Sequence, residues 1–212
     1  MSTQFISTLV ELRTIYGTLQ PDSVAVRCVL PHLDKHHRAF IALSPFVVLA
    51  STDAQGLSDV SPRGDLPGFV AALDDHTLLL PDRPGNKKLE TLSNVLENPN
   101  VALIFFVPGR NDSLRVNGRA RITTAPALLA TLAVQGKSPC SALIVTVEQV
   151  WLHCGKALIR SRLWDTEAKA KPNVLPTLGK MLADQVSGVD AVQTDARLEN
   201  GNKNRLWGEA AS

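Results

Sequence analysis

The stretch FVVLASTDAQGLSDVS, residues 46–61, decides the fold of this chain of 212 residues. Its first part, residues 46–50, is short, apolar and rich in β-branched and aromatic side chains, which favours a buried strand. Residues 53–56, Asp-Ala-Gln-Gly, are typical of a tight turn, and residues 57–61 return the chain as a second strand. Two strands joined by a short turn pair antiparallel, so the stretch predicts a β-hairpin.

The sequence after this hairpin predicts further strands. These segments are residues 68–73, 77–80, 101–107, 113–123 and 141–152. Residues 113–123 alternate between an apolar face and a polar face, which is typical of a strand with one buried side. Hairpin links imply antiparallel pairing, and closure of the sheet removes exposed edges. We count about six strands, because some of these segments are very short, and expect a mainly β protein with helices, built as a six-stranded antiparallel barrel with peripheral α-helices.

Helices are predicted between and outside the strands. Apolar side chains at helical spacing predict them at residues 3–16, 35–43, 87–97, 126–132 and from Pro176 onward. The chain is expected to be a single domain, residues 1–212. We divide it into an N-terminal helical segment (1–44), a barrel core (45–165) and a C-terminal helical extension (166–212).

Composition and charge exclude several classes of function. The chain is 44% hydrophobic and 20% charged, with a formal net charge of +2. This balance argues against wholesale coating of nucleic acid or of an anionic membrane. No apolar run approaches the roughly 18 residues of a membrane span, and the start lacks the features of a signal peptide. Three distant cysteines give neither a disulfide framework nor a thiolate metal motif. We expect a cytoplasmic protein with no metal, no nucleic-acid partner and no membrane.

The first candidate for a binding site is the turn Pro-Gly-Asn-Lys-Lys, residues 84–88. Gly85 permits close backbone approach, and Asn86, Lys87 and Lys88 stand at a predicted helix start. Free N–H groups at a helix start attract anions but disfavour lysines, so an anionic ligand would explain these residues. An ordinary polar turn is the alternative interpretation.

Three further segments carry candidate binding residues. The Gly- and Pro-rich stretch 61–68 holds Arg63 in a stiff loop that suits a phosphate, or alternatively in a surface salt bridge with Asp65. The polar face of residues 113–123 carries three arginines, of which Arg115 is the best candidate; solvated arginines are the alternative. In residues 151–164 two tryptophans bracket several cations, which suits a flat anionic ligand or, alternatively, caps the barrel.

These four segments in this order resemble the pyridoxamine 5'-phosphate oxidase-like flavoproteins, the FMN-binding split barrels. The matching strings are SPFVVLASTDAQGLSDVSPRGDLPGFV, LLLPDRPGNKKLETLSNVLENPNVALIFF, SLRVNGRARIT and HCGKALIRSRLW, within residues 36–165. The SPRGD and RSRLWD strings are most similar to the PPOX-class branch. The resemblance implies a six-stranded split β-barrel and a homodimer with two FMN sites between the subunits.

The resemblance also implies where FMN is held. The end of the second strand and the turn before the next helix would contact the phosphate, and the last segment would close over the flavin from the partner subunit. The implied cofactor-binding residues are Ser61, Arg63, Asn86, Lys87, Lys88, Arg115, Arg160, Ser161, Arg162 and Trp164. No residue is assigned a catalytic role, because the flavin itself carries the hydride chemistry.

The function implied is an FMN-dependent oxidoreductase acting on a small molecule. The alternative is a flavin-, deazaflavin- or haem-binding protein of the same fold with little catalytic activity, for which His153 is a weak candidate haem ligand. True pyridoxamine phosphate oxidases carry basic residues where this chain has Ser58, Pro84 and Gly85, and Gln where it has Ser113. FMN binding therefore carries over better than oxidation of pyridoxamine 5'-phosphate.

Overall fold

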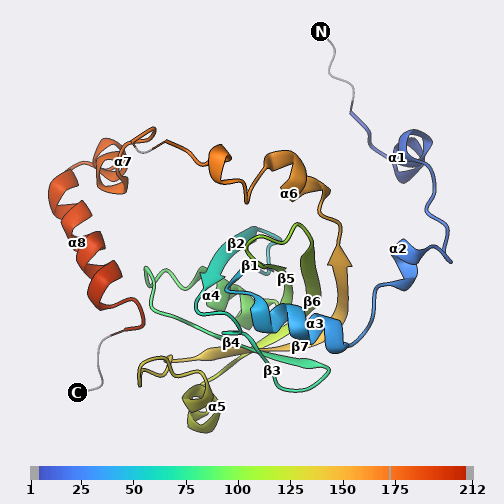
Figure 1. Ribbon diagram of the computed structural model, residues 1–212, viewed down its shortest axis with the longest axis horizontal. Coiled ribbons are helices and arrows are strands. Elements are labelled where there is room, and N and C mark those ends of the chain that lie inside the picture. The colour runs from blue at the N-terminus through green and yellow to red at the C-terminus, as the bar shows by residue number, and fades with distance from the viewer. Residues whose placement is uncertain (1–4, 172, 209–212) are drawn as a thin grey trace.

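One antiparallel sheet forms the body of the computed structural model, which describes residues 5–171 and 173–208 (Figure 1). Its strands are β1 Phe46–Thr52, β2 Ser58–Gly64, β3 Ala71–Ala72, β4 Thr77–Pro81, β5 Asn100–Phe106, β6 Ser113–Thr123 and β7 Ala142–His153. Their order is β2-β1-β5-β6-β7-β4-β3, and all neighbouring pairs are antiparallel. The predicted hairpin is confirmed, since Phe46 to Thr52 pair with Gly64 to Ser58.

The expected six-stranded barrel needs correction. The described residues form seven strands, and β2 and β3 end the hydrogen-bonded order without pairing with each other. The predicted strand at residues 68–73 shrinks to the two residues of β3. Its first part is a turn instead, because Gly68 has a left-handed φ of 80° and Phe69 N–H donates to the Leu66 carbonyl. Closure of the sheet is therefore not confirmed.

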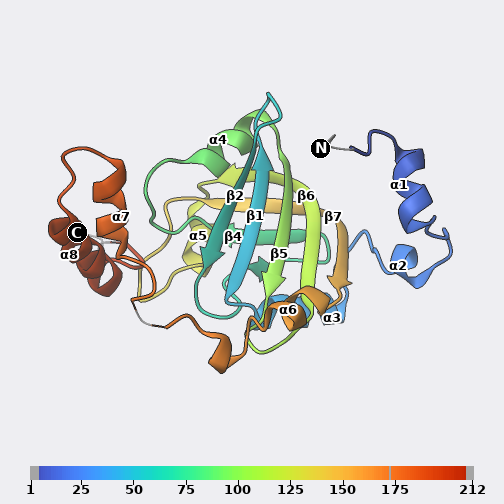
Figure 2. The same ribbon diagram turned by 90° about the horizontal axis from the view of Figure 1, so that it is seen from above.

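The sheet has two halves that share its longest strands. In the first half, residues 113–119 of β6 pair with β5. In the second half, residues 142–146 of β7 pair with β4. The β6–β7 register shifts between Asn117 and Gly118, which marks a β-bulge. The strands of the first half run across those of the second, so the sheet wraps around its own inner face (Figure 2).

The hydrophobic core fills the space between these halves. Leu49 of β1, Leu103 of β5 and Leu114 of β6 are buried against Leu80 of β4 and Val145 of β7. The predicted alternation of β6 is confirmed, because Leu114, Val116 and Ala120 are buried while the arginines lie on the other face. Burial of apolar surface is the main favourable term in folding, so both halves depend on each other.

Helices surround the sheet. Their bounds are α1 Leu9–Tyr16, α2 Val24–Arg27, α3 Lys35–Leu43, α4 Glu90–Glu97, α5 Pro126–Thr131, α6 Lys156–Ser161, α7 Leu178–Gln185 and α8 Ala191–Asn204, with a short 3₁₀ helix at Thr166–Ala168. The predicted helix at residues 35–43 is confirmed. The predicted helix 3–16 starts only at Leu9, because Thr8 and Glu11 form a capping box, and its first two residues lie outside the described part. Helices α2 and α6 were not predicted.

Helix α4 begins at Glu90, three residues after the predicted start at residue 87. Lys87 and Leu89 have φ values of 62° and 61°, which belong to the left-handed region and cannot continue a right-handed helix. The lysines therefore precede the helix rather than stand in its first turn.

The outer helices lie on two sides of the sheet (Figure 1). α1 and α2 lie on one side, and no residue of either is buried. α7 and α8 lie on the other side and pack against each other, where Gly179 N–H donates to Asp195 Oδ1 at 2.8 Å. In the part of the chain that the structure describes, no helix combines the length and apolar character needed to cross a bilayer.

We predict that Gly118→Ala destabilises the protein by about 3 kcal/mol or more, because the close strand contact cannot relax without moving backbone. A Cβ at residue 118 would lie 2.0 Å from the Thr146 carbonyl oxygen. Urea unfolding measures this loss. Gly201→Ala in α8 is the matched control, since its Cβ would meet nothing nearer than Arg205 Nη2 at 3.9 Å. Equal stability of the two variants would contradict the prediction.

Candidate functional site

Strand β2 is tied to both ends of the segment that leads into α4. Arg63 Nη1 donates to Asp82 Oδ1 at 2.6 Å, and Thr91 Oγ1 donates to Asp59 Oδ2 at 3.2 Å. Asp59, Ser61 and Arg63 share one face of β2, because their side chains alternate with those between them. The residues between Asp82 and Thr91 thus bridge the part of β2 that carries Ser61.

Arg63 is a half-buried cation with an incomplete set of partners. Its side chain is 19% exposed, and that of Asp82 is 23% exposed. Nε of Arg63 is buried and has no hydrogen-bond acceptor within the described residues. The alternative salt bridge with Asp65 is wrong, because Asp65 lies beyond the end of β2 and pairs with Arg83 instead.

Residues 82–89 form a loop, called here the 82–89 loop, that carries the predicted residues Lys87 and Lys88. Asn86 Oδ1 accepts from Lys88 N–H at 3.0 Å, which fixes the turn locally. Lys88 Nζ lies 3.5 Å from Glu90 Oε1, but both side chains are mostly exposed, so this pair contributes little to stability. Lys87 is exposed and takes part in no ion pair within the described residues. The loop thus presents two cations to solvent.

Arg115 lies in a different environment, on the outer face of β6. Its guanidinium carbon is 4.7 Å from the ring centroid of Trp151, the residue opposite it on β7. This distance is within cation–π range. Two residues along β6, Ser113 is buried and its Oγ has no partner among the described residues. The site offers an aromatic plane with a cation beside it.

The segment after β7 carries the remaining predicted residues. Arg160 is exposed on α6, and the exposed Ser161 donates from Oγ to the Leu158 carbonyl at 3.1 Å. Arg162 adopts a left-handed conformation and pairs with Asp165 at 2.5 Å. This hydrogen bond holds the pKa of the Asp165 carboxyl below its usual range.

Trp164 anchors this segment to the β5–β6 turn. Its Nε1 donates to the Arg110 carbonyl at 2.6 Å, and its side chain is half-buried. Arg110 also pairs with Asp112 at 2.7 Å, and that hydrogen bond lowers the pKa of the Asp112 carboxyl. Trp164 therefore holds α6 against one end of the sheet.

The structure sorts the predicted residues into two groups. Ser61, Arg63 and the 82–89 loop lie together near α4. The second group contains Arg115 and the α6 segment, and Figure 2 shows α4 and α6 at opposite ends of the first half of the sheet. Register also places Arg63 on the core face and Arg115 on the outer face. One chain alone does not bring the two groups together.

Sequence reasoning missed three residues around the first group, namely Asp82, Arg83 and Trp207. Asp82 and Arg83 pair with Arg63 and Asp65, and Trp207 Nε1 donates to Asp65 Oδ1 at 2.8 Å. The signal for Asp82 and Arg83 was their place directly before the Pro-Gly-Asn-Lys-Lys turn. Trp207 stands 142 residues from Asp65, and no local pattern indicates this contact.

A known protein family matches the part of the chain that holds most of these segments. Residues 33–154 match the family described as Pyridoxamine 5'-phosphate oxidase. The chain belongs to this family. The resemblance found in the sequence is thereby confirmed at the level of the family.

Several solved structures are similar to this member of the pyridoxamine 5'-phosphate oxidase family. HupZ of Group A Streptococcus is 18% identical, with 57% of this chain and 93% of that chain covered and a TM-score of 0.47. A putative pyridoxamine 5'-phosphate oxidase of Lactobacillus delbrueckii is 22% identical, with 57% and 95% covered and a TM-score of 0.45. An FMN-binding protein of Syntrophomonas wolfei is 13% identical, with 54% and 82% covered and a TM-score of 0.43.

These identities and TM-scores are low. A comparison with curated proteins found no match. The family assignment therefore stands on the match of residues 33–154.

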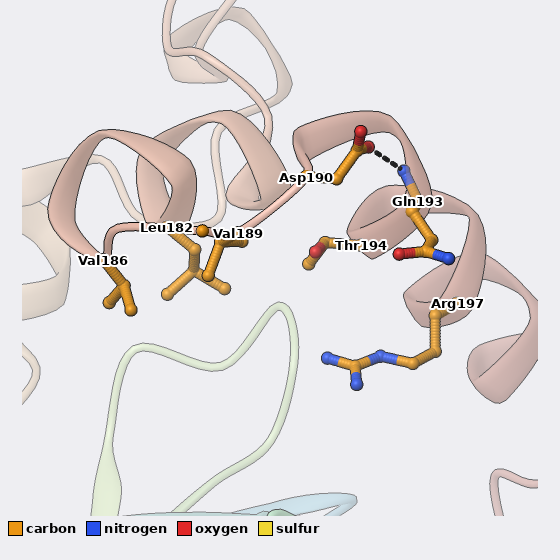
Figure 3. Close-up of a pocket in the computed structure, with 8 residues that line it drawn as sticks. Leu182, Val186, Val189, Asp190, Gln193, Thr194 and Arg197 are labelled. Atoms are coloured by element: carbon orange, nitrogen blue, oxygen red, sulfur yellow. Dashed lines mark hydrogen bonds between the residues drawn. The ribbon is translucent and has the colours of Figure 1, made fainter.

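This family member also has a pocket in its C-terminal helical part. Its volume is about 590 Å³, and it lies between α7 and α8 (Figure 3). Leu182 and Val186 line one side, and Thr194 and Arg197 line the other. No predicted cofactor residue lines it. Over residues 5–171 and 173–208, no group of three or more His, Cys, Asp or Glu side chains is arranged to hold a metal ion.

We predict that Asp82→Ala lowers the free energy of unfolding by about 1–3 kcal/mol, because it leaves the half-buried Arg63 without its carboxylate. Inorganic phosphate is expected to restore part of this loss by replacing the missing acceptor. Thermal unfolding with and without phosphate measures both effects. Asp75→Ala is the control, since Asp75 pairs with Arg38 in a more exposed bridge. The same phosphate response in both variants would contradict an anion site at Arg63.

Proposed function

We propose that this protein binds FMN and uses it as an oxidoreductase acting on a small molecule. The observation that carries the proposal is the buried Nε of Arg63, which has no acceptor within the described residues. A buried donor without an acceptor costs about 1–3 kcal/mol. A phosphate oxygen that entered beside the 82–89 loop would be such an acceptor, and the family membership makes FMN the candidate that carries it.

The residues of the first group fit a phosphate monoester. Arg63 offers a positioned guanidinium, and Lys87 and Lys88 offer two exposed ammonium groups on the adjoining loop. Ser61 and Asn86 offer neutral hydrogen-bonding groups to the same ligand. The sequence has no dinucleotide fingerprint for a second phosphate, which favours FMN over FAD.

The second group fits the flat part of the cofactor. Arg115 beside Trp151 supplies a cation and an aromatic plane. We propose that Arg115, Arg160, Ser161, Arg162 and Trp164 approach the flavin of the partner subunit, because one chain holds them apart from the phosphate group. FMN, when bound, supplies hydride transfer at its N5 atom. The residues of this chain hold the phosphate, orient the ring and exclude water.

The test of this function identifies the bound cofactor. The purified protein is denatured, and the released chromophore is identified by absorption and chromatography. FMN is expected. Release of FAD, a deazaflavin or haem would contradict the proposal. If the bound FMN is neither reduced by a small-molecule donor nor reoxidised by an acceptor, the result would favour the alternative, a binding protein with little catalytic activity.

We predict that Lys87→Glu combined with Lys88→Glu raises the dissociation constant for FMN by tenfold or more, on the order of 1.4 kcal/mol or above. Each change replaces attraction for the phosphate with repulsion. Folding is expected to survive, because both side chains are exposed. Fluorescence titration with FMN measures the affinity. The control, Lys169→Glu with Lys171→Glu, makes the same charge change at exposed residues elsewhere; equal weakening in both would show a non-local charge effect instead.

We predict that the protein is a homodimer in solution. α1 leaves large apolar side chains uncovered, with Leu9 76% and Tyr16 77% exposed. On the outer sheet face, Val60 is 62% and Phe46 39% exposed. Such surface favours association. Light scattering at micromolar concentration measures the mass, and a monomer that still holds its flavin would contradict a site shared between subunits.

A further inference from the structure

Asp65 is a fully buried carboxylate at the base of the 82–89 loop. Its Oδ2 accepts from Arg83 Nε at 2.6 Å. Its Oδ1 accepts from its neighbour's backbone, Leu66 N–H, and from Trp207 Nε1, both at 2.8 Å. A buried carboxylate stays charged only when donors surround it, so each of these donors matters.

Arg83 is held in place by this carboxylate and by one more acceptor. Its Nη2 donates to the Leu132 carbonyl at 2.7 Å, just after α5. The side chain is 13% exposed, which leaves it little freedom. Arg83 is the second residue of the 82–89 loop, so its position fixes where the loop leaves β4.

The C-terminal segment, residues 205–208, lies against the same loop. Lys137 Nζ donates to the Gly208 carbonyl at 2.6 Å, which anchors the segment next to Trp207. A Cβ built on Gly208 would lie 3.4 Å from Pro84 Cγ, so this part of the segment is in contact with the loop itself. Two independent contacts thus bring the C-terminal segment to residues 65 and 84.

We propose that Trp207 is a positioning residue for the cofactor phosphate, acting through Asp65 and Arg83 on the 82–89 loop. The inference rests on the proposed function, because it takes this loop as the phosphate-binding element. Without the indole N–H, Oδ1 of Asp65 keeps only the donor Leu66 N–H. The carboxylate then holds Arg83 less firmly, and the loop that presents Lys87 and Lys88 samples more conformations. Ordering the loop on binding costs free energy. Trp207 lowers this cost, because it fixes the loop before the ligand binds.

The first experiment uses the protein without cofactor. Trp207→Phe keeps an aromatic ring but removes the N–H, and Leu206→Ala is the control on the same segment, since Leu206 is exposed. Hydrogen exchange is followed at the amides of residues 85–88. Faster exchange in Trp207→Phe than in wild type and Leu206→Ala is expected. Unchanged exchange in Trp207→Phe and also in Trp207→Ala would overturn the proposal.

The second experiment measures FMN affinity in a double-mutant cycle. Trp207→Phe is expected to weaken FMN binding by roughly fivefold. This is less than the full loss of a charge-assisted hydrogen bond, because only part of that loss reaches the phosphate-binding loop. Asp65→Asn is expected to weaken it as well. In the Asp65→Asn background, Trp207→Phe should have no further effect, because the carboxylate through which it acts is gone. Additive effects would show a merely structural role and would overturn the proposal.

The two experiments separate this inference from the proposed function. Failure of the wild-type protein to bind FMN refutes the proposed function, while the exchange experiment still decides whether Trp207 orders the loop. Faster exchange with unchanged FMN affinity refutes the positioning role and leaves the proposed function standing.

Discussion

The close approach of β6 and β7 at Gly118 is the constraint on which the rest of the structure depends. A side chain there would overlap the Thr146 carbonyl, so the strands meet only because residue 118 has no Cβ. The register shift at this point lets one half of the sheet turn onto the other. The core then forms between the halves, and β2 lies at one edge, where its polar end reaches the 82–89 loop.

One half-buried and one mostly buried ion pair set the shape of the candidate site. Arg63 with Asp82 and Arg83 with Asp65 join the end of β2 to the start of the loop. Such pairs add little net stability, because removing charges from water offsets much of their attraction. They do fix geometry, since an unpaired buried charge is costly. The site therefore gains fixed guanidinium groups, and the exposed lysines beyond them add charge without rigidity.

Local patterns predicted the strands because burial has a period of two residues. For this reason β6 was predicted correctly, and so was the hairpin formed by residues 46–61. The start of α4 could not be predicted, because the left-handed conformations at Lys87 and Leu89 arise in residues that normally avoid them. The alternative salt bridge between Arg63 and Asp65 was wrong for a related reason. Asp65 is only two residues away in the sequence, whereas Asp82 becomes a neighbour of Arg63 only after folding.

The same limit explains why the residues of the candidate site fall into two separate groups. The sequence places the cationic segments in order along the chain, and that order carried the resemblance to the family, which the match of residues 33–154 confirms. The order of segments does not say which face of the sheet each residue occupies. Strand register puts Arg63 on the core face and Arg115 on the outer face, so the two side chains lie on opposite faces of the sheet. If both groups bind one ligand, a second chain must supply one of them. Binding of the cofactor would then stabilise the assembly, and assembly would strengthen binding of the cofactor.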